Sequence, residues 1–240
     1  MLDIHASWTP IKSLLYETLN EKILPNLSNT KYQPEREDIF NVFKMPVSDI
    51  KVIILGQDPY PTEGNAMGYA FAVPADKKIP ASLRVIKEEI VKEFAIPCLA
   101  NHEHPEWRTL KDWRDSGVFL LNTALTIEAG KIGSHLGYWK NCIGSVIKYI
   151  SKTHPCIWML WGKKAQSFKG NICNALAFDI EVNSIETIEK MPINNKTNYI
   201  LEAPHPTARG NTKRFKGCNH FLYADAILRK LKKREITWIR

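Results

Sequence analysis

Four short apolar runs, separated by segments with helical spacing, constrain the fold of this 240-residue chain more than any other feature. The runs are Val52–Leu55, Val118–Leu121, Ile157–Leu160 and Tyr199–Leu201. Each is apolar throughout and only a few residues long, which is typical of strands buried on both faces. Strands that alternate with helices favour a mostly parallel sheet covered by helices.

Three segments of the chain show helical spacing, and the first of them is a weaker stripe than the other two. The apolar residues that share one helical face are Leu83, Ile86, Ile90 and Phe94 in the first, Ile143, Val146, Ile147 and Ile150 in the second, and Ala224, Ile227, Leu228 and Leu231 in the third. The polar segment Ile185–Lys196 is predicted to be a surface loop. We therefore predict one domain over residues 1–240 with an α/β fold: a three-layer α/β/α sandwich around a mostly parallel, four-stranded central sheet.

Polar residues follow each of the four predicted strands. Asp58 comes just after the first strand and Asn122 directly after the second, while Lys163 and Lys164 follow the third and His205 the fourth. In open α/β sheets, ligands bind in the crevice outside the carboxyl ends of the strands. The pattern alone therefore predicts that these side chains face one crevice and form an active site.

The charge balance and the cysteines narrow the possible partners and cofactors. The net charge is +8, the isoelectric point is near 9.2, and many of the cations lie late in the chain. A basic surface attracts phosphate, although it is also typical of many soluble proteins. The five cysteines contain no C-x-x-C pair, so the sequence indicates neither a disulfide framework nor a zinc or iron–sulfur site. The first ten residues lack the pattern of a signal peptide, and no stretch approaches the length of a membrane span.

Several motifs, taken in their order along the chain, resemble the uracil-DNA glycosylases of family 1. The three principal motifs are GQDPY (56–60), LLNTALT (120–126) and HPTARG (205–210), and the flanking ones are GYAF (68–71), IPASL (79–83), GSH (133–135), LWGKKAQ (160–166) and FKGCNHF (215–221). One such motif alone would be weak evidence, but their joint order covers most of the chain. The resemblance implies an enzyme that flips uracil out of DNA and hydrolyses its bond to deoxyribose, releasing uracil and leaving an abasic site.

The resemblance implies two catalytic residues, Asp58 and His205. Breaking a glycosidic bond builds positive charge on the sugar and negative charge on the departing base. The Asp58 carboxylate is expected to lie beneath the sugar and to orient the attacking water. Neutral His205 is expected to donate a hydrogen bond to uracil O2. Taken alone, each could be an ordinary turn residue, since Asp58 and His205 both precede a proline.

Four further residues are implied to bind uracil. Asn122 would donate to O4 and accept from N3–H, a pattern that cytosine reverses. Tyr60 would lie against C5 and exclude the methyl group of thymine. Phe71 would stack on the ring, and Gln57 would form part of the pocket wall. Ordinary core packing for the aromatic residues, and a turn role for the asparagine, are the alternatives.

The residues implied to hold DNA lie in small loops and belong to the family's phosphate-contacting or intercalating segments. They are Ser82, Ser134, Gly162, Lys163, Pro206, Thr207 and Arg209. Hydroxyl and main-chain N–H groups in such loops fix the position of DNA without reading its sequence. For the two serines, a role in a helix cap or turn is an equally good interpretation.

Three residues depart from the family pattern. Pro61 replaces a histidine that helps to position the catalytic water, Arg209 replaces the leucine wedge, and Lys163 replaces a serine. The first two departures resemble the poxvirus branch, whereas the rest of the chain looks more like the cellular enzymes. We hypothesise that Arg209 makes DNA insertion depend partly on salt-sensitive contacts.

Two other functions are consistent with the sequence: a DNA-binding scaffold such as a polymerase accessory protein, and a glycosylase for a different base. The presence of Asp58, Asn122 and His205 argues against a pure scaffold, and Tyr60 with Asn122 argues for uracil. We expect no metal or other cofactor and no lyase step. We expect a monomer that acts on single- and double-stranded DNA inside the cell, in the cytoplasm or nucleoid of a bacterium or the host cytoplasm or nucleus for a virus. A proteinaceous inhibitor or a replication protein is a further expected partner.

Overall fold

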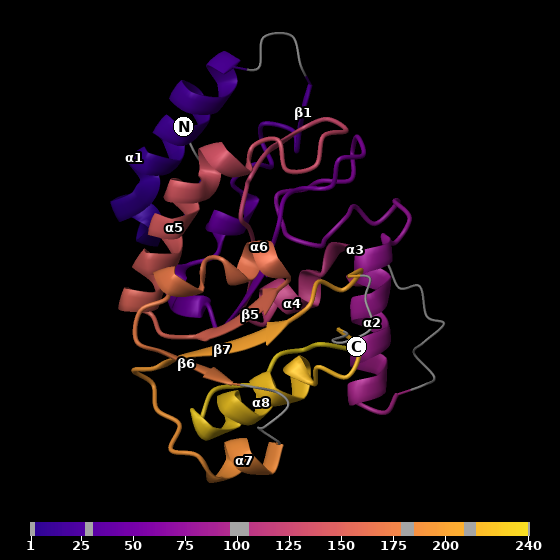
Figure 1. The fold of residues 1–240 in the computed structure, drawn as a ribbon, viewed down its shortest axis with the longest axis vertical. Helices are drawn as coiled ribbons and strands as arrows, with labels where there is room; N and C mark the ends of the chain where they lie inside the picture. Colours follow the sequence, from indigo (N-terminus) through magenta and orange to yellow (C-terminus); the bar gives the residue numbers. More distant parts are fainter. Residues whose placement is uncertain (1–2, 27–30, 97–105, 179–184, 209–214, 240) are drawn as a thin grey trace.

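A five-stranded parallel sheet forms the centre of the computed structural model, which describes residues 3–26, 31–96, 106–178, 185–208 and 215–239 (Figure 1). Its strands are β2 (Val52–Gly56), β3 (Val118–Asn122), β5 (Ile157–Trp161), β6 (Ala175–Phe178) and β7 (Asn198–Ala203). They lie in the order β3-β2-β5-β7-β6, and every neighbouring pair is parallel. Strands β1 (Tyr32–Gln33) and β4 (Ile127–Glu128) form a separate antiparallel pair.

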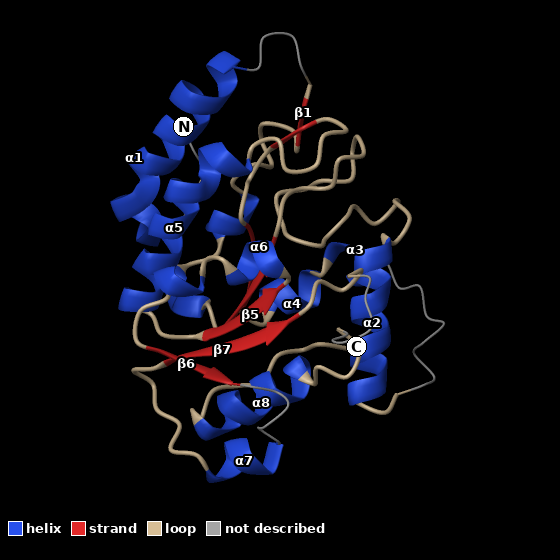
Figure 2. Cartoon of the chain, viewed as in Figure 1, coloured by secondary structure: helices blue, strands red, loops and turns tan. Residues whose placement is uncertain are grey.

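Helices cover both faces of the sheet, as Figures 1 and 2 show. The longer ones are α1 (Thr9–Glu17), α2 (Ala81–Glu93), α5 (Leu136–Thr153) and α8 (His220–Lys230). The shorter ones are α3 (Glu106–Thr109), α4 (Lys111–Asp115), α6 (Lys163–Gln166) and α7 (Ile185–Lys190). Short helical turns lie at Ala6–Trp8, Thr18–Ile23, Leu24–Asn26, Asn41–Lys44, Val47–Asp49 and Lys169–Asn171. None of the helices described is long and apolar enough to span a membrane.

Alternate residues of the strands enter two separate hydrophobic cores. Along β2, Val52 and Ile54 pack with α2 and α8, whereas Ile53 and Leu55 pack with α1 and α5. Side chains of a strand point alternately to opposite faces, so a strand between two helical layers must be apolar at every position. This explains the continuous apolar runs in the sequence and confirms the predicted three-layer α/β/α sandwich.

The number of strands and one loop were predicted wrongly. The sheet has five strands rather than four, because β6 at its edge was missed; Ala175, Leu176 and Ala177 of this strand are exposed and give no buried-strand pattern. The segment Ile185–Lys196 was predicted to be a loop, but it begins with helix α7. Ile188 of this helix is fully buried in the core shared with α8, and Ile185, Met191 and Ile193 of the segment are partly buried against the same core. The helix is only six residues long, so its apolar residues give little periodicity.

The predicted helical stripes and the four predicted strands are confirmed, with small shifts at their ends. The stripe that begins at Leu83 lies on α2, the stripe from Ile143 to Ile150 lies on α5, and Leu231 directly follows the end of α8. Because β2, β3, β5 and β7 are parallel, the residues after all four strands lie at the same edge of the sheet.

Candidate active site

A cavity of about 320 Å³ lies at the carboxyl edge of the sheet, and we call it the active-site cavity. Eight of the thirteen residues predicted for the site line it: Gln57, Asp58, Tyr60, Phe71, Ser82, Asn122, His205 and Thr207. Ser134, Gly162, Lys163 and Pro206 do not line it, and Arg209 falls outside the described residues. The polar residues after β2, β3 and β7 therefore converge, as the strand pattern predicted. The same prediction was wrong for β5, because Lys163 and Lys164 are exposed at the start of α6 and do not line the cavity.

A main-chain N–H group from a distant loop holds the Asp58 side chain. The N–H of Gly133 donates a hydrogen bond of 2.5 Å to Asp58 Oδ2. Burial raises the pKa of the Asp58 carboxyl above its ordinary value, while hydrogen bonds from Gly133 and from the Gln57 side chain act in the opposite direction. The carboxylate is thus partly desolvated and fixed in orientation, which suits a group that stabilises positive charge.

Asn122 ends β3 and is nearly buried, with 6% of its surface exposed. It lies over Gly56, the last residue of β2 and its partner in the sheet register. A Cβ atom on Gly56 would lie 2.5 Å from Asn122 Oδ1 and 3.5 Å from a carbon of the Phe71 ring. Glycine is therefore required at this position, since any side chain would displace the carboxamide. Within the described part of the chain, that carboxamide makes no hydrogen bond and remains free for a ligand.

Tyr60 and Phe71 are joined by a hydrogen bond. The Tyr60 hydroxyl donates to the carbonyl oxygen of Phe71 at 3.0 Å, and the Ser82 hydroxyl oxygen lies 3.0 Å from the Tyr60 oxygen. Burial raises the pKa of Tyr60 to about 12, so the hydroxyl stays protonated. Phe71 has φ of 65°, a left-handed conformation that costs energy in a residue with a side chain. The hydrogen bond helps to hold this conformation.

The rings of Phe71 and His205 line the cavity, and the Trp161 ring packs against Phe71 behind it. The Phe71 ring centre lies 5.5 Å from that of Trp161 and 6.2 Å from that of His205, in tilted arrangements. Phe71 is only 9% exposed but lines the cavity, so part of its ring remains open to a planar ligand.

The orientation of the His205 ring is fixed by its own turn. The backbone N–H of Thr207 donates to His205 Nδ1 at 3.2 Å, and the Thr207 hydroxyl lies 3.0 Å from the same atom. Since Nδ1 accepts a hydrogen bond, the proton of the neutral ring is on Nε2. Burial lowers the pKa of His205 below its ordinary value. The site therefore presents a neutral imidazole with an N–H donor.

The loop residues predicted to hold DNA lie near the cavity on separate elements. Gly162 follows β5 with φ of 90°, and a Cβ at this position would lie 3.0 Å from His205 Cβ, so glycine allows a close approach of the two loops. Lys163 is exposed at the start of α6. The Ser134 hydroxyl accepts from the N–H of Glu128 at 2.8 Å and so supports the turn before α5.

Two cavity features were missed from the sequence. The N–H of Gly133 fixes Asp58, although only its neighbour Ser134 was selected from the GSH motif. Ile132 lines the cavity and is 68% exposed, the highest value among the large apolar side chains described as exposed. The sequence offered only weak signals for these two residues: Gly133 belongs to a motif, and Ile132 is an isolated apolar residue in a polar loop. Neither side chain has a reactive or hydrogen-bonding group.

One group of possible metal ligands is found among the described residues: Glu89, Glu93 and Cys218. Their ligand atoms lie within 4.8 Å of one another. However, Glu89 accepts hydrogen bonds from the N–H of Gly217, and Glu93 from those of Phe221 and Leu222. Burial raises the pKa of the Cys218 thiol, which disfavours the thiolate that a metal requires. These carboxyl groups fix the start of α8, and the group does not face the active-site cavity.

Comparisons with known proteins give one consistent result. Residues 43–229 match the family model described as the uracil DNA glycosylase superfamily. The uracil-DNA glycosylase of Aliivibrio fischeri is 36% identical over 231 residues, which cover 95% of this chain and 92% of that protein. The enzyme of the same name from Francisella tularensis subsp. novicida is 37% identical over 211 residues, covering 85% of this chain and 83% of that protein.

Solved structures show the same fold at lower sequence identity. Mimivirus uracil-DNA glycosylase superposes with a TM-score of 0.76 at 23% identity, covering 99% of this chain and 88% of the other. A variant of the mimivirus enzyme, solved in complex with UGI, gives a TM-score of 0.79, also at 23% identity, with 99% and 89% covered. The match to the family model, and the identity to relatives over most of their length, show that this chain belongs to the uracil-DNA glycosylase superfamily.

Proposed function

We propose that the active-site cavity binds a uracil flipped out of DNA and that the protein hydrolyses the bond between this base and deoxyribose. The activity itself follows from membership of the superfamily: the chain is a DNA-repair hydrolase that excises uracil. The observation that carries the assignment of the site is the convergence of Asp58, Asn122 and His205 on one cavity. A base within a duplex cannot reach such a cavity, so the nucleotide must leave the base stack.

Asp58 stabilises the positive charge that grows on the sugar and orients the attacking water. The Gly133 N–H directs the carboxylate and supports its ionised form. Pro61 also lines the cavity, and its carbonyl oxygen accepts from the N–H of Gly130 at 3.2 Å. With a proline at this position, no side chain of residue 61 can hydrogen-bond to the water, so Asp58 carries more of that task.

His205 stabilises the negative charge on the departing base. Its Nε2–H donates to uracil O2, and the neutral ring requires no proton from solvent. A preorganised donor of this type contributes roughly 10²–10³ in rate in enzymes where one was removed. The Thr207 N–H sets the tautomer and therefore acts as a positioning group.

Asn122, Tyr60, Phe71 and Gln57 select the base. Asn122 donates to O4 and accepts from N3–H, Phe71 stacks on the ring, and Tyr60 occupies the space that the thymine methyl group would need. The carbonyl oxygen of Gln57 accepts from the Thr123 hydroxyl at 2.5 Å and from the N–H of Ala124 at 3.0 Å. This ties the Asp58 segment to the strand end that carries Asn122.

The DNA backbone is held by short loops around the cavity: those that carry Ser82, Ser134, Gly162, Lys163, Pro206, Thr207 and Arg209. Ser82 uses its hydroxyl on Tyr60, but its main-chain N–H lies in the first turn of α2, where such groups have no intrahelical acceptor. A phosphate can therefore bind the start of this helix. Lys163 adds a cation that Coulomb attraction brings toward a phosphate.

The whole chain acts as one domain and a monomer, on single- and double-stranded DNA, and therefore inside the cell. The chemistry needs only side chains and water, so we propose that it proceeds without a metal and without a lyase step. Because a mimivirus relative was solved with UGI, we also propose that a protein inhibitor of this kind can bind the present chain.

An oligonucleotide with one uracil tests the proposed function. After incubation with the protein, alkali should break the strand at that position, because an abasic site is labile to alkali. Without alkali the strand should stay intact, and a thymine oligonucleotide should be unaffected. Strand scission before alkali would contradict the absence of a lyase step, and no scission after alkali would contradict the activity.

A further inference from the structure

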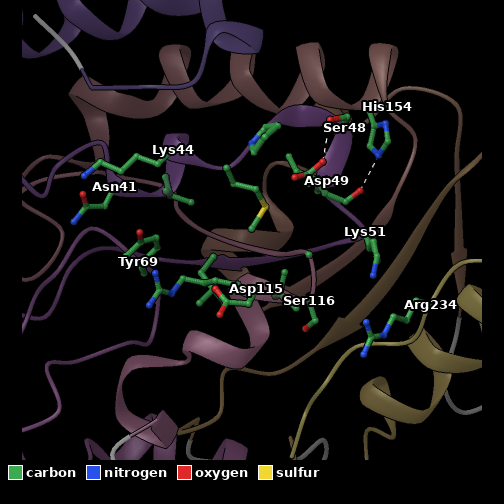
Figure 3. A pocket seen from close by; sticks show the side chains of 18 of the residues that line it. Asn41, Lys44, Ser48, Asp49, Lys51, Tyr69, Asp115, Ser116, His154 and Arg234 are labelled. Carbon is green, nitrogen blue, oxygen red and sulfur yellow. Dashed lines mark hydrogen bonds between the residues drawn. The ribbon is translucent and has the colours of Figure 1, made fainter.

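A second and larger cavity, of about 680 Å³, opens at the amino-terminal edge of the sheet (Figure 3). Lys51 and Gly117, which directly precede β2 and β3, line it, as does His154 after α5. A strand advances about 3.3 Å per residue, so this edge lies roughly 15 Å from the active-site cavity. None of the residues assigned to uracil excision lines this cavity.

The cavity carries a surplus of positive charge. Its cationic side chains are Lys44, Lys51, Arg114, Lys233 and Arg234, and its carboxylates are Asp49 and Asp115. Two of these groups have partners outside the cavity, since Lys44 lies 3.3 Å from Asp3 and Asp115 forms an ion pair with Lys111. Asp49 is therefore the carboxylate left to balance four cations in the lining.

Two of these cations, Arg234 and Lys233, lie close enough to Lys51 to repel it. Burial is the largest cause that lowers the pKa of Lys51, the charges of Arg234 and Lys233 lower it further, and Asp49 partly opposes them. Figure 3 shows Lys51 and Arg234 at the same end of the cavity. Among the described residues, the side chains of Lys51, Lys233 and Arg234 make no hydrogen bond or ion pair. A bound anion would relieve this repulsion.

Ser48, Ser116 and His154 of the lining already make hydrogen bonds within the protein. The Ser48 hydroxyl donates to Asp49 at 3.0 Å, and that of Ser116 donates to the carbonyl oxygen of Asp112 at 2.7 Å. His154 Nε2 donates to the carbonyl oxygen of Ile50 at 2.8 Å, which leaves Nδ1 of the neutral ring as an acceptor. The lysine and arginine side chains and the Tyr69 hydroxyl are thus the side-chain donors that remain for a ligand, and the cations among them suit phosphate best.

The other end of the cavity is aromatic. The Arg114 guanidinium lies over the Tyr69 ring at 4.2 Å, and both residues line the cavity. Tyr69 lies across the cavity from Lys51 and Arg234 in Figure 3. A guanidinium that lies over an aromatic ring offers its own planar surface, on which a further planar group can stack. The volume falls within the range of about 300–1,000 Å³ that is usual for small-molecule sites.

We propose that this cavity binds a nucleoside phosphate. The phosphate lies between Lys51, Lys233 and Arg234, and the planar base lies toward Arg114 and Tyr69. The ligand must carry both parts, because one end of the cavity offers charge and the other a flat surface. This site is separate from the excision of uracil, so either can fail without the other.

Calorimetric titration of the full chain with adenosine 5′-monophosphate tests the proposal, with adenosine and inorganic phosphate as partial ligands. The variant carrying Lys51→Gln and Arg234→Gln should bind at least about tenfold more weakly. A matched control with Lys148→Gln and Lys190→Gln loses the same charge from exposed helix positions outside the cavity, and it should bind like the parent chain. Lys233→Gln is a second cavity variant if the first fails to fold.

Several results would overturn the proposal. They are the absence of binding at millimolar nucleotide, equal binding by the cavity variant and the control, and equal affinity for inorganic phosphate alone. Displacement of the nucleotide by free uracil would place it in the active-site cavity instead. If a thymine oligonucleotide displaces the nucleotide, and the cavity variant no longer binds that oligonucleotide, the surface is a contact for DNA instead. The parent chain and both variants should excise uracil at the same rate, which also shows that the variants are folded.

Discussion

The Tyr60 hydroxyl donates a 3.0 Å hydrogen bond to the carbonyl oxygen of Phe71, and this bond joins the two aromatic residues proposed to enclose the base. A phenol has one proton, so the Ser82 hydroxyl, 3.0 Å away, must be the donor in its contact with Tyr60. The position of one ring thus depends on the backbone of the other. We propose that selection against thymine depends on this arrangement, because Tyr60 cannot move away without breaking both contacts.

Replacing Tyr60 by Ala should allow the protein to release thymine, because the space beside C5 of the base becomes open. The measurement is thymine release from an oligonucleotide with a single defined thymine target. Tyr60→Phe is the matched control, since it keeps the ring and removes only the hydroxyl. It should still reject thymine, but it leaves buried polar groups unpaired and should lose about 1–3 kcal/mol of stability. Thymine rejection by Tyr60→Ala at the level of the parent chain would contradict the proposed pocket.

Replacing Asp58 by Asn should stabilise the fold at neutral pH. Burial raises the folded-state pKa of Asp58, so the stability linked to this group is fully present below its unfolded pKa and is lost as the pH rises through the folded one. Asparagine can still accept the Gly133 hydrogen bond without the cost of a buried charge. Thermal unfolding should show a higher Tm for the variant at pH 7, and the difference should vanish in acid. A lower Tm at pH 7 would mean that ionised Asp58 stabilises the fold.

The rate of uracil release should stay constant as the pH falls from 8 through 6.5. An ordinary histidine would gain a proton over this range, but burial lowers the pKa of His205, so the ring stays neutral. The loss of rate at lower pH should begin above the ordinary pKa of an aspartate, because the pKa of Asp58 is raised. Single-turnover rates across the range provide the measurement. A decline centred at pH 6.5 would indicate an unshifted histidine.

Glu93 should make the fold less stable in alkali. Burial raises its pKa to about 8, aided by the Glu89 carboxylate and opposed by hydrogen bonds from the N–H groups of Leu222 and Phe221. Because the folded-state pKa is raised, the associated stability is lost as the pH rises through about 8. Glu93→Gln should therefore show a smaller fall in Tm between pH 7 and 9. Glu186→Gln, at an exposed position, should behave like the parent chain; equal slopes for all three proteins would contradict the role of Glu93.

The sequence predicted the three layers and the position of the site for a physical reason. Strands between two helical layers are apolar at every position. The apolar run stops where the chain reaches the polar residues of the site, as with Leu55 before Gly56–Pro61 and Leu121 before Asn122. Such ends all lie at one edge of a parallel sheet. In the edge strand β6 only Phe178 is buried and the other three residues are exposed, so the same signal was absent.

The contacts that fix the site could not be predicted in the same way. The Gly133 N–H on Asp58 and the Thr207 N–H on His205 are main-chain groups, which every residue except proline has. Ser82 was predicted to contact phosphate, but its hydroxyl contacts Tyr60, a relationship between a helix start and a strand end that no local pattern encodes. The motifs identified the reactive side chains, while the orientation of each depends on the packed fold.

Single-turnover excision of uracil, with the oligonucleotide fully bound, tests the central role of Asp58 most directly. The variant Asp58→Asn should bind the oligonucleotide as well as the parent chain does. Its rate of uracil release should fall by roughly 100-fold or more, since a neutral amide cannot stabilise the positively charged sugar or activate water as a carboxylate does. Release by the variant at the rate of the parent chain would contradict the mechanism.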